Sequence, residues 1–154
     1  MMIIGGYSID YEKRTWILTY LEGDEFLINE GPSMTIARRE HACAFDAKNQ
    51  QVIVAGGGYP WTDSMESLDL SSPGSLWKMG PRLPFKVFGH QLIFHEKLET
   101  ILFIGGYNYD ALNYSEEIHK MERNGTWTKF ELMSLITPRR YFVALSVPSN
   151  SWTC

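Results

Sequence analysis

The side chains best able to bind a metal ion are few in this sequence and mostly far apart. The four histidines are His41, His90, His95 and His119, and the two cysteines are Cys43 and Cys154. Only His90 and His95 are near neighbours, and an offset of five along a strand directs them to opposite faces. No Cys-x-x-Cys pair occurs. We therefore expect no metal site and no cofactor, and we expect His41 and His90 to have structural roles.

The sequence also lacks the arrangements that bind phosphate or activate a nucleophile. Gly56-Gly57-Gly58 is not followed by the Lys-Ser/Thr of a phosphate-binding loop, and no Gly-x-Ser-x-Gly motif occurs. The carboxylates of Asp63, Glu66 and Asp69 are spaced by three residues. Such carboxylates diverge along a strand, so general acid–base catalysis has no support. We expect them to lie in a solvated loop, and we expect a noncatalytic protein.

Composition narrows the class of protein further. The 154 residues carry 14 Lys and Arg against 18 Asp and Glu, and this net charge of −4 argues against nucleic-acid binding. The longest apolar runs are about six residues, too short to cross a membrane, and the N-terminus has no signal-peptide pattern. With two cysteines, we expect a reduced, cytoplasmic protein. Aromatic residues make up 14%, a share that favours a β-rich core.

A threefold repeat is the strongest pattern in the chain. Apolar runs end in glycine pairs at Gly5-Gly6, Gly56-Gly57 and Gly105-Gly106, whose first glycines are separated by 51 and 49 residues. The aromatic residues Phe26, Trp77 and Trp127 follow those first glycines by 21, 21 and 22 residues. A basic or aromatic segment then enters another apolar run at 38–45, 85–92 and 138–145. Three landmarks in one register indicate three copies of one structural unit.

Each copy is predicted to be a four-stranded antiparallel meander. In the third copy we expect strands at 101–105, 115–121, 127–132 and 140–147, with Asn124-Gly125 as a two-residue hairpin turn. The glycine pairs are expected to adopt positive φ and to let a neighbouring sheet approach closely. The later aromatics Phe26, Trp77 and Trp127 are expected to fill the space between adjacent sheets.

The period of about 50 residues, the apolar run before the glycine pair and the later tryptophan resemble the kelch repeat. This resemblance covers residues 2 to 147 and implies an all-β fold, a β-propeller of kelch type with three four-stranded antiparallel blades. We place the propeller segment at 1–147, with repeats at about 2–46, 51–95 and 100–147, and a C-terminal tail at 148–154. The sequence departs from the family pattern at Phe26, where a tryptophan is usual, and at 68–70 and 118–121, where a tyrosine is usual.

Three blades raise the question of closure, because propellers typically have 4 to 8. The predicted strand at 140–147 is the one that the first copy lacks. One explanation is that the chain is a piece of a longer kelch protein, such as half of a six-bladed ring. The other is self-association, in which two chains join head-to-tail and each lends this strand to the other.

One end of the predicted blades gathers aromatic and arginine side chains. Loops alternate between the two ends of a meander, so the loop after each glycine pair and the loop entering each innermost strand share an end. An aromatic and arginine surface is typical of protein-binding hot spots. The candidate partner-binding residues are Tyr59, Trp61, Tyr107, Tyr109, Arg38, Arg39, Arg139 and Arg140. The alternative is that Arg39 and Arg139 only pack at the start of a strand.

The resemblance also carries a functional expectation. In kelch adaptors of ubiquitin ligases this end receives the substrate, so we expect a noncatalytic module that recognises a partner protein or peptide, with arginines favouring an acidic segment. Cullin-type ubiquitin ligase adaptor function is the specific form of this prediction. The alternatives are a kelch-fold enzyme or its relic, oxidase-like or modifying a small molecule, and a secreted or structural propeller piece.

Overall fold

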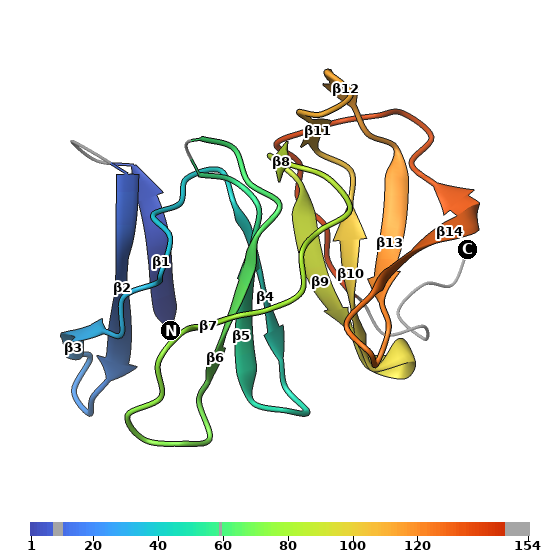
Figure 1. Ribbon diagram of the computed structural model, residues 1–154. Helices are drawn as coiled ribbons and strands as arrows, with labels where there is room; N and C mark the ends of the chain where they lie inside the picture. Colours follow the sequence, from blue (N-terminus) through green and yellow to red (C-terminus); the bar gives the residue numbers. More distant parts are fainter. Residues whose placement is uncertain (8–10, 59, 147–154) are drawn as a thin grey trace.

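A computed structural model describes residues 1–7, 11–58 and 60–146. Among these residues the chain forms antiparallel strands, and the only helix is one 3-10 turn, η1 (Glu96–Leu98). Figure 1 shows three layers of strands standing side by side in chain order. The prediction of an all-β fold is confirmed, with four small sheets of three or four strands. The four sheets do not form a closed ring in this structure.

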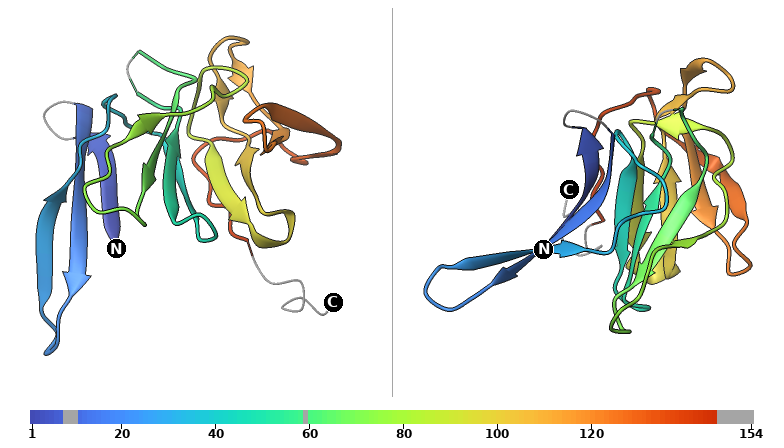
Figure 2. Two further views of the ribbon diagram at one scale, coloured as in Figure 1. Left: turned by 60° about the horizontal axis from the view of Figure 1, so that its bottom comes forward. Right: turned by 60° about the vertical axis from the view of Figure 1, so that its left-hand side comes forward.

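The first sheet has three strands in the order β1 (Met2–Tyr7), β2 (Tyr11–Tyr20) and β3 (Phe26–Gly31). β1 is an edge strand, because β2 is its only neighbour among the residues that the structure describes. The distal part of the β2–β3 hairpin projects away from the other layers, as the right-hand view of Figure 2 shows. Phe26 begins β3 on this projection and is 63% exposed. The prediction that Phe26 fills space between sheets is therefore wrong, because none of the described sheets covers this part of the hairpin.

The second sheet has four strands, β4 (Ala42–Asp46), β5 (Gln51–Ala55), β6 (Met65–Asp69) and β7 (Lys78–Met79), in that order. The third sheet repeats this arrangement with β9 (Gln91–His95), β10 (Thr100–Ile104), β13 (Glu117–Met121) and β14 (Trp127–Ser134). The register is the same in both sheets: Ala42 pairs with Ala55, and Gln91 pairs with Ile104. Two successive copies therefore have the same pairing of their first two strands.

Side chains alternate between the two faces of these strands and build the core between the sheets. Val52 and Val54 belong to a cluster on which Met2 and Ile4 of the first sheet pack. Their neighbours Ile53 and Ala55 point the other way, into a cluster with residues of the third sheet. Trp77 is 6% exposed and Trp127 packs against the core, as predicted for these two aromatics.

Three short strands form a small sheet at one end of the molecule. Its order is β12 (Asn113–Tyr114), β11 (Tyr107–Asn108) and β8 (Val87–Phe88). This sheet joins the loop that follows the third glycine pair to the segment that enters β9, as Figure 1 shows. The two kinds of loop thus share one end, as the meander predicts.

Two details of the third copy differ from the sequence-based predictions. The β13–β14 turn spans residues 122–126, with Gly125 at φ 84° donating its N–H to the Glu122 carbonyl, so it is longer than the predicted two-residue turn. Residues 140–146 form no strand, and the prediction of a strand there is wrong for the described part. A strand requires a pairing neighbour, and the described residues provide none at this position.

The structure identifies no membrane-spanning helix among the residues that it describes.

Candidate functional site

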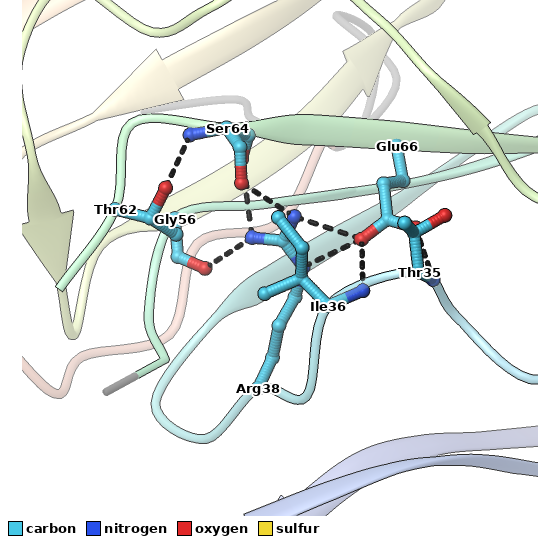
Figure 3. A network of polar contacts seen from close by, with 7 residues as sticks. All are labelled: Thr35, Ile36, Arg38, Gly56, Thr62, Ser64 and Glu66. Atoms are coloured by element: carbon cyan, nitrogen blue, oxygen red, sulfur yellow. Dashed lines mark hydrogen bonds and ion pairs between the residues drawn. The ribbon is translucent and has the colours of Figure 1, made fainter. Parts of the chain in front are cut away.

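A buried ion pair fixes the segment that enters the second sheet. Arg38 donates from Nε and Nη2 to Oε1 of Glu66, at 3.2 and 2.9 Å, and neither side chain is exposed. The same guanidinium donates to the carbonyls of Gly56 and Ser64 at 2.7 and 3.1 Å and to the Ser64 hydroxyl at 2.7 Å. Figure 3 shows these contacts converging on the arginine. Burial lowers the pKa of Arg38, and the bonds to Glu66 oppose that effect.

The Glu66 carboxylate also holds the backbone on the other side. The N–H groups of Thr35 and Ile36 donate to it at 2.6 and 3.2 Å, so one side chain of β6 anchors the segment that precedes β4 (Figure 3). Two predictions are corrected here. Glu66 does not lie in a solvated loop, and Arg38 does not lie on a binding surface. Both side chains are fully buried and hydrogen-bonded within this internal network.

A chain of backbone hydrogen bonds connects equivalent positions of the three copies. The N–H of Gly89 donates to the carbonyl of Glu40 at 3.0 Å, and the N–H of Tyr141 donates to the carbonyl of Gly89 at 2.8 Å. Glu40, Gly89 and Tyr141 all have left-handed backbone, at φ 54°, 63° and 54° respectively. Each immediately precedes the first residue of a homologous segment, His41, His90 or Phe142. The three entry segments are therefore held in one repeating geometry.

The glycine pairs permit this close approach. The N–H groups of Gly6, Gly57 and Gly106 donate to carbonyls of the following entry segment at 2.8, 2.8 and 2.9 Å. Gly57 has φ +65°, and a Cβ there would lie 2.2 Å from the Arg39 carbonyl oxygen. A side chain at this position would force the two segments apart.

Above these backbone contacts lies a continuous set of side chains that we call the aromatic–arginine cluster. Its members come from entry segments and from loops that follow glycine pairs. They are Arg39, Glu40, Trp61, Phe88, Tyr107, Tyr114, Arg140 and Tyr141.

Arg140 is at the centre of the aromatic rings in this cluster. Its Cζ lies 4.9, 5.3, 5.4 and 5.8 Å from the ring centroids of Tyr141, Phe88, Tyr114 and Tyr107. These distances are within the range of cation–π attraction. Among the described residues no carboxylate lies within ion-pair distance of Arg140. Within residues 1–7, 11–58 and 60–146 its charge is thus supported by rings and is not neutralised by an acid.

Trp61 extends the cluster toward the second sheet. Its ring stacks on Phe88, with centroids 4.2 Å apart and planes at 23°, and Arg39 lies 5.3 Å from the Trp61 ring. Phe88 is 7% exposed, so it forms the floor of the cluster, and Trp61 is half-buried above it.

Glu40, the one acid of the cluster, is bound by other members of the cluster. The Tyr141 hydroxyl donates to Oε2 of Glu40 at 2.5 Å, and Arg39 lies 3.8 Å from the other carboxylate oxygen. Burial, and then the bond to Glu40, raise the pKa of Tyr141. Glu40 therefore joins the first and third entry segments to each other.

The structure brings together four of the eight predicted partner-binding residues. Arg39, Trp61, Tyr107 and Arg140 belong to the cluster. Tyr109 is 44% exposed at a loop tip outside it, and Arg139 is exposed with its Nε donating to the Thr137 carbonyl at 3.1 Å. Arg38 is buried. Tyr59 lies outside the described residues.

Sequence reasoning did not select Glu40, Phe88 or Tyr141 for this site. A usable signal existed, because Arg39, Phe88 and Arg140 occupy the same position of successive copies. The same is true of Glu40, Gly89 and Tyr141. Comparing columns of the repeat would have placed all of them at one end of the molecule.

Two histidines directly precede β4 and β9: His90 is 1% exposed, and His41 is half-buried. Burial, and then the charge of Arg38, lower the pKa of His41 to about 4. Burial, and then the charges of His41 and Arg38, lower the pKa of His90 to about 3. Neither ring nitrogen of His90 has a hydrogen-bond partner among the described residues. The described part of the chain contains no group of three or more His, Cys, Asp or Glu side chains placed to bind a metal.

Comparison with known proteins identifies the fold alone. No family model matches the sequence. No curated protein matches it. Solved structures do match, and one of them, titled "Structure of YjhT", superposes with a TM-score of 0.61 at 20% identity. The match covers 84% of this chain and 41% of that one, so this chain spans less than half the length of that neighbour.

Proposed function

We propose that the chain is part of a kelch-type β-propeller and that it recognises an acidic segment of a partner protein through the aromatic–arginine cluster. The blade assignment is supported by the common register of the second and third sheets and by glycine pairs at equivalent positions. In the cell, we propose substrate recognition for a cullin-type ubiquitin ligase, the role that the family resemblance implies.

The observation that carries this proposal is the environment of Arg140. Four rings surround its guanidinium, which restricts the side chain before any partner binds. A planar guanidinium binds a carboxylate with two parallel hydrogen bonds, and no such partner of Arg140 is present among the described residues. Tyr114 and Tyr141, at 49% and 58% exposure, provide apolar contact area beside that charge.

The test is selection from a displayed random peptide library, followed by measurement of Kd for the enriched peptides. We expect enrichment of Asp and Glu beside an apolar residue, and we expect affinity to fall as salt rises. Arg140→Ala should weaken binding at least tenfold. Arg140→Lys should recover only part of the loss, because an ammonium keeps the charge without the planar donor edge.

Arg123→Ala is the matched control. Arg123 is exposed in the β13–β14 turn, at the opposite end of the third sheet, and its removal should leave Kd unchanged. Equal losses for the two variants would show only a general effect of net charge. Enrichment of peptides without acidic residues would overturn the proposed specificity.

A further inference from the structure

Residues 142–146 have the side-chain pattern of a strand that lacks its partner. Phe142 and Ala144 pack on the outer face of the third sheet, in the cluster of Leu102, Ile104 and Ile118. Val143 and Leu145 alternate with them and are 81% and 76% exposed. This alternation is typical of a sheet strand. The segment occupies the position relative to the third sheet that β9 occupies relative to the second.

The first sheet has the complementary vacancy. β1 has an unpaired edge, whereas the corresponding strands β5 and β10 each pair on both sides. A hollow of about 420 Å³ lies beside this edge, lined by side chains that include Met2, Ile4, Phe45, Val52 and Leu70. Ile3, on the other face of the strand, is 48% exposed.

We propose that residues 142–146 of one chain pair with β1 of a second copy and thereby complete its first sheet. The register follows from the repeat. Val143 corresponds to Ala42 and Gln91, because Tyr141, Glu40 and Gly89 are equivalent, and Ile4 corresponds to Ala55 and Ile104, because each precedes the first glycine of a pair. Since Ala42 pairs with Ala55 and Gln91 with Ile104, Val143 pairs with Ile4 of the second copy. Ala144 then pairs with Ile3, and Leu145 with Met2.

This register places the exposed side chains where there is space for them. Paired residues share a face of the sheet, so Val143 and Leu145 lie beside Ile4 and Met2 of the second copy. That face of the first sheet looks toward the second sheet, and it is where the hollow lies. Two exposed apolar side chains of one copy therefore enter an apolar hollow of the other.

A second copy is the occupant that this geometry favours, because one chain carries both complementary surfaces. The contact is head-to-tail, so each copy contributes both surfaces and the assembly closes when the rotations add to a full turn. Two chains, each contributing its first, second and third sheets, complete a closed ring of six such sheets in this proposal, and neither copy of β1 then has a free edge.

Light scattering after size-exclusion chromatography tests the assembly. We expect about 35 kDa, twice the 17.7 kDa of one chain, over concentrations of about 1–100 µM. Leu145→Glu should give a folded monomer, because it places a charge in the hollow. Leu132→Glu is the matched control, since Leu132 is 100% exposed on β14 and should leave the dimer intact.

Disulfide formation tests the register in a background of Cys43→Ser and Cys154→Ser. A chain carrying Ile3→Cys, mixed with one carrying Ala144→Cys, should form a covalent heterodimer under mild oxidation. Ile3→Cys mixed with Leu145→Cys should not, because neighbouring positions point to opposite faces. A wild-type protein that stays monomeric throughout the concentration range overturns the proposal, because the edge of β1 then does not pair with a second copy. Equal cross-linking of both pairs overturns the register.

Discussion

The guanidinium of Arg38 and the carboxylate of Glu66 form an ion pair from which solvent is fully excluded, with Nη2 and Oε1 2.9 Å apart. The arginine belongs to the segment between the first and second sheets, and the glutamate belongs to β6. The pair is therefore internal to the scaffold that positions the neighbouring Arg39 and Glu40. Loss of the pair should lower the stability of the protein and should also displace Arg39 and Glu40 at the surface.

Replacement of Glu66 by leucine should lower the free energy of unfolding by about 3–5 kcal/mol. The change leaves a buried guanidinium without its counter-ion and two backbone N–H groups without an acceptor. Urea denaturation followed by circular dichroism measures the loss. Arg82→Ala is the control, because the Arg82–Asp63 pair is at the surface and should cost less than about 1 kcal/mol. Similar losses for the two variants would contradict the structural role of the buried pair.

Stability should fall as the pH is lowered from about 6.5 toward 4. His41 and His90 stay neutral in the folded protein because their pKa values are about 4 and about 3, whereas in the unfolded chain both are protonated below about 6.5. The unfolded state thus binds more protons than the folded state in this window. By linkage, each histidine lowers the free energy of unfolding by about 2 kcal/mol at pH 5. Urea midpoints at pH 7.5 and pH 5.0 measure the effect.

A variant at position 90 separates this effect from the titration of carboxylates. His90→Phe introduces the residue that the third copy has at the equivalent position, Phe142. It should remove roughly half of the loss between the two pH values, because one of two titrating histidines is gone. An unchanged pH dependence in His90→Phe would refute the assignment to this residue.

The parts of the fold that sequence predicts well are those fixed by local pattern. The apolar run before the third glycine pair predicts β10 within one residue at each end, and the positive φ of Gly56 and Gly105 at 64° and 59° agrees with the expectation. The shared end of Arg39, Trp61 and Arg140 follows from the alternation of loops in a meander.

The parts that sequence misses depend on neighbours that no local pattern specifies. The burial of Glu66 is not visible in the local sequence, because its partner Arg38 is 28 residues away and approaches from a nonregular segment. Phe26 was expected in the core because the repeat places it there, but the distal hairpin has no sheet beside it. Residues 140–147 have strand composition, yet hydrogen bonding to another strand is what makes a strand.

Substitution of Gly57 should separate steric conflict from backbone strain. Gly57→Val places a side chain 2.2 Å from a backbone oxygen at φ +65°, and it should cost at least about 3 kcal/mol. Gly74→Ala is the control, because Gly74 has φ +76° with nothing within 4 Å of its added Cβ. That variant should cost only about 1–2 kcal/mol, from the left-handed backbone alone. Thermal melts of both variants give the comparison, and equal shifts would refute a close approach at Gly57.

Trp61 should contribute to stability as well as to binding. Its ring stacks on Phe88 at 4.2 Å, so Trp61→Ala removes an aromatic contact and apolar burial, with an expected loss of about 2 kcal/mol. Tyr109→Ala should leave the melting temperature within about one degree, because Tyr109 lies outside the cluster and is 44% exposed. Differential scanning calorimetry of both variants tests the difference. If Trp61→Ala melts like Tyr109→Ala, the stacked contact contributes nothing to the folded state, and Trp61 is available to a partner without structural cost.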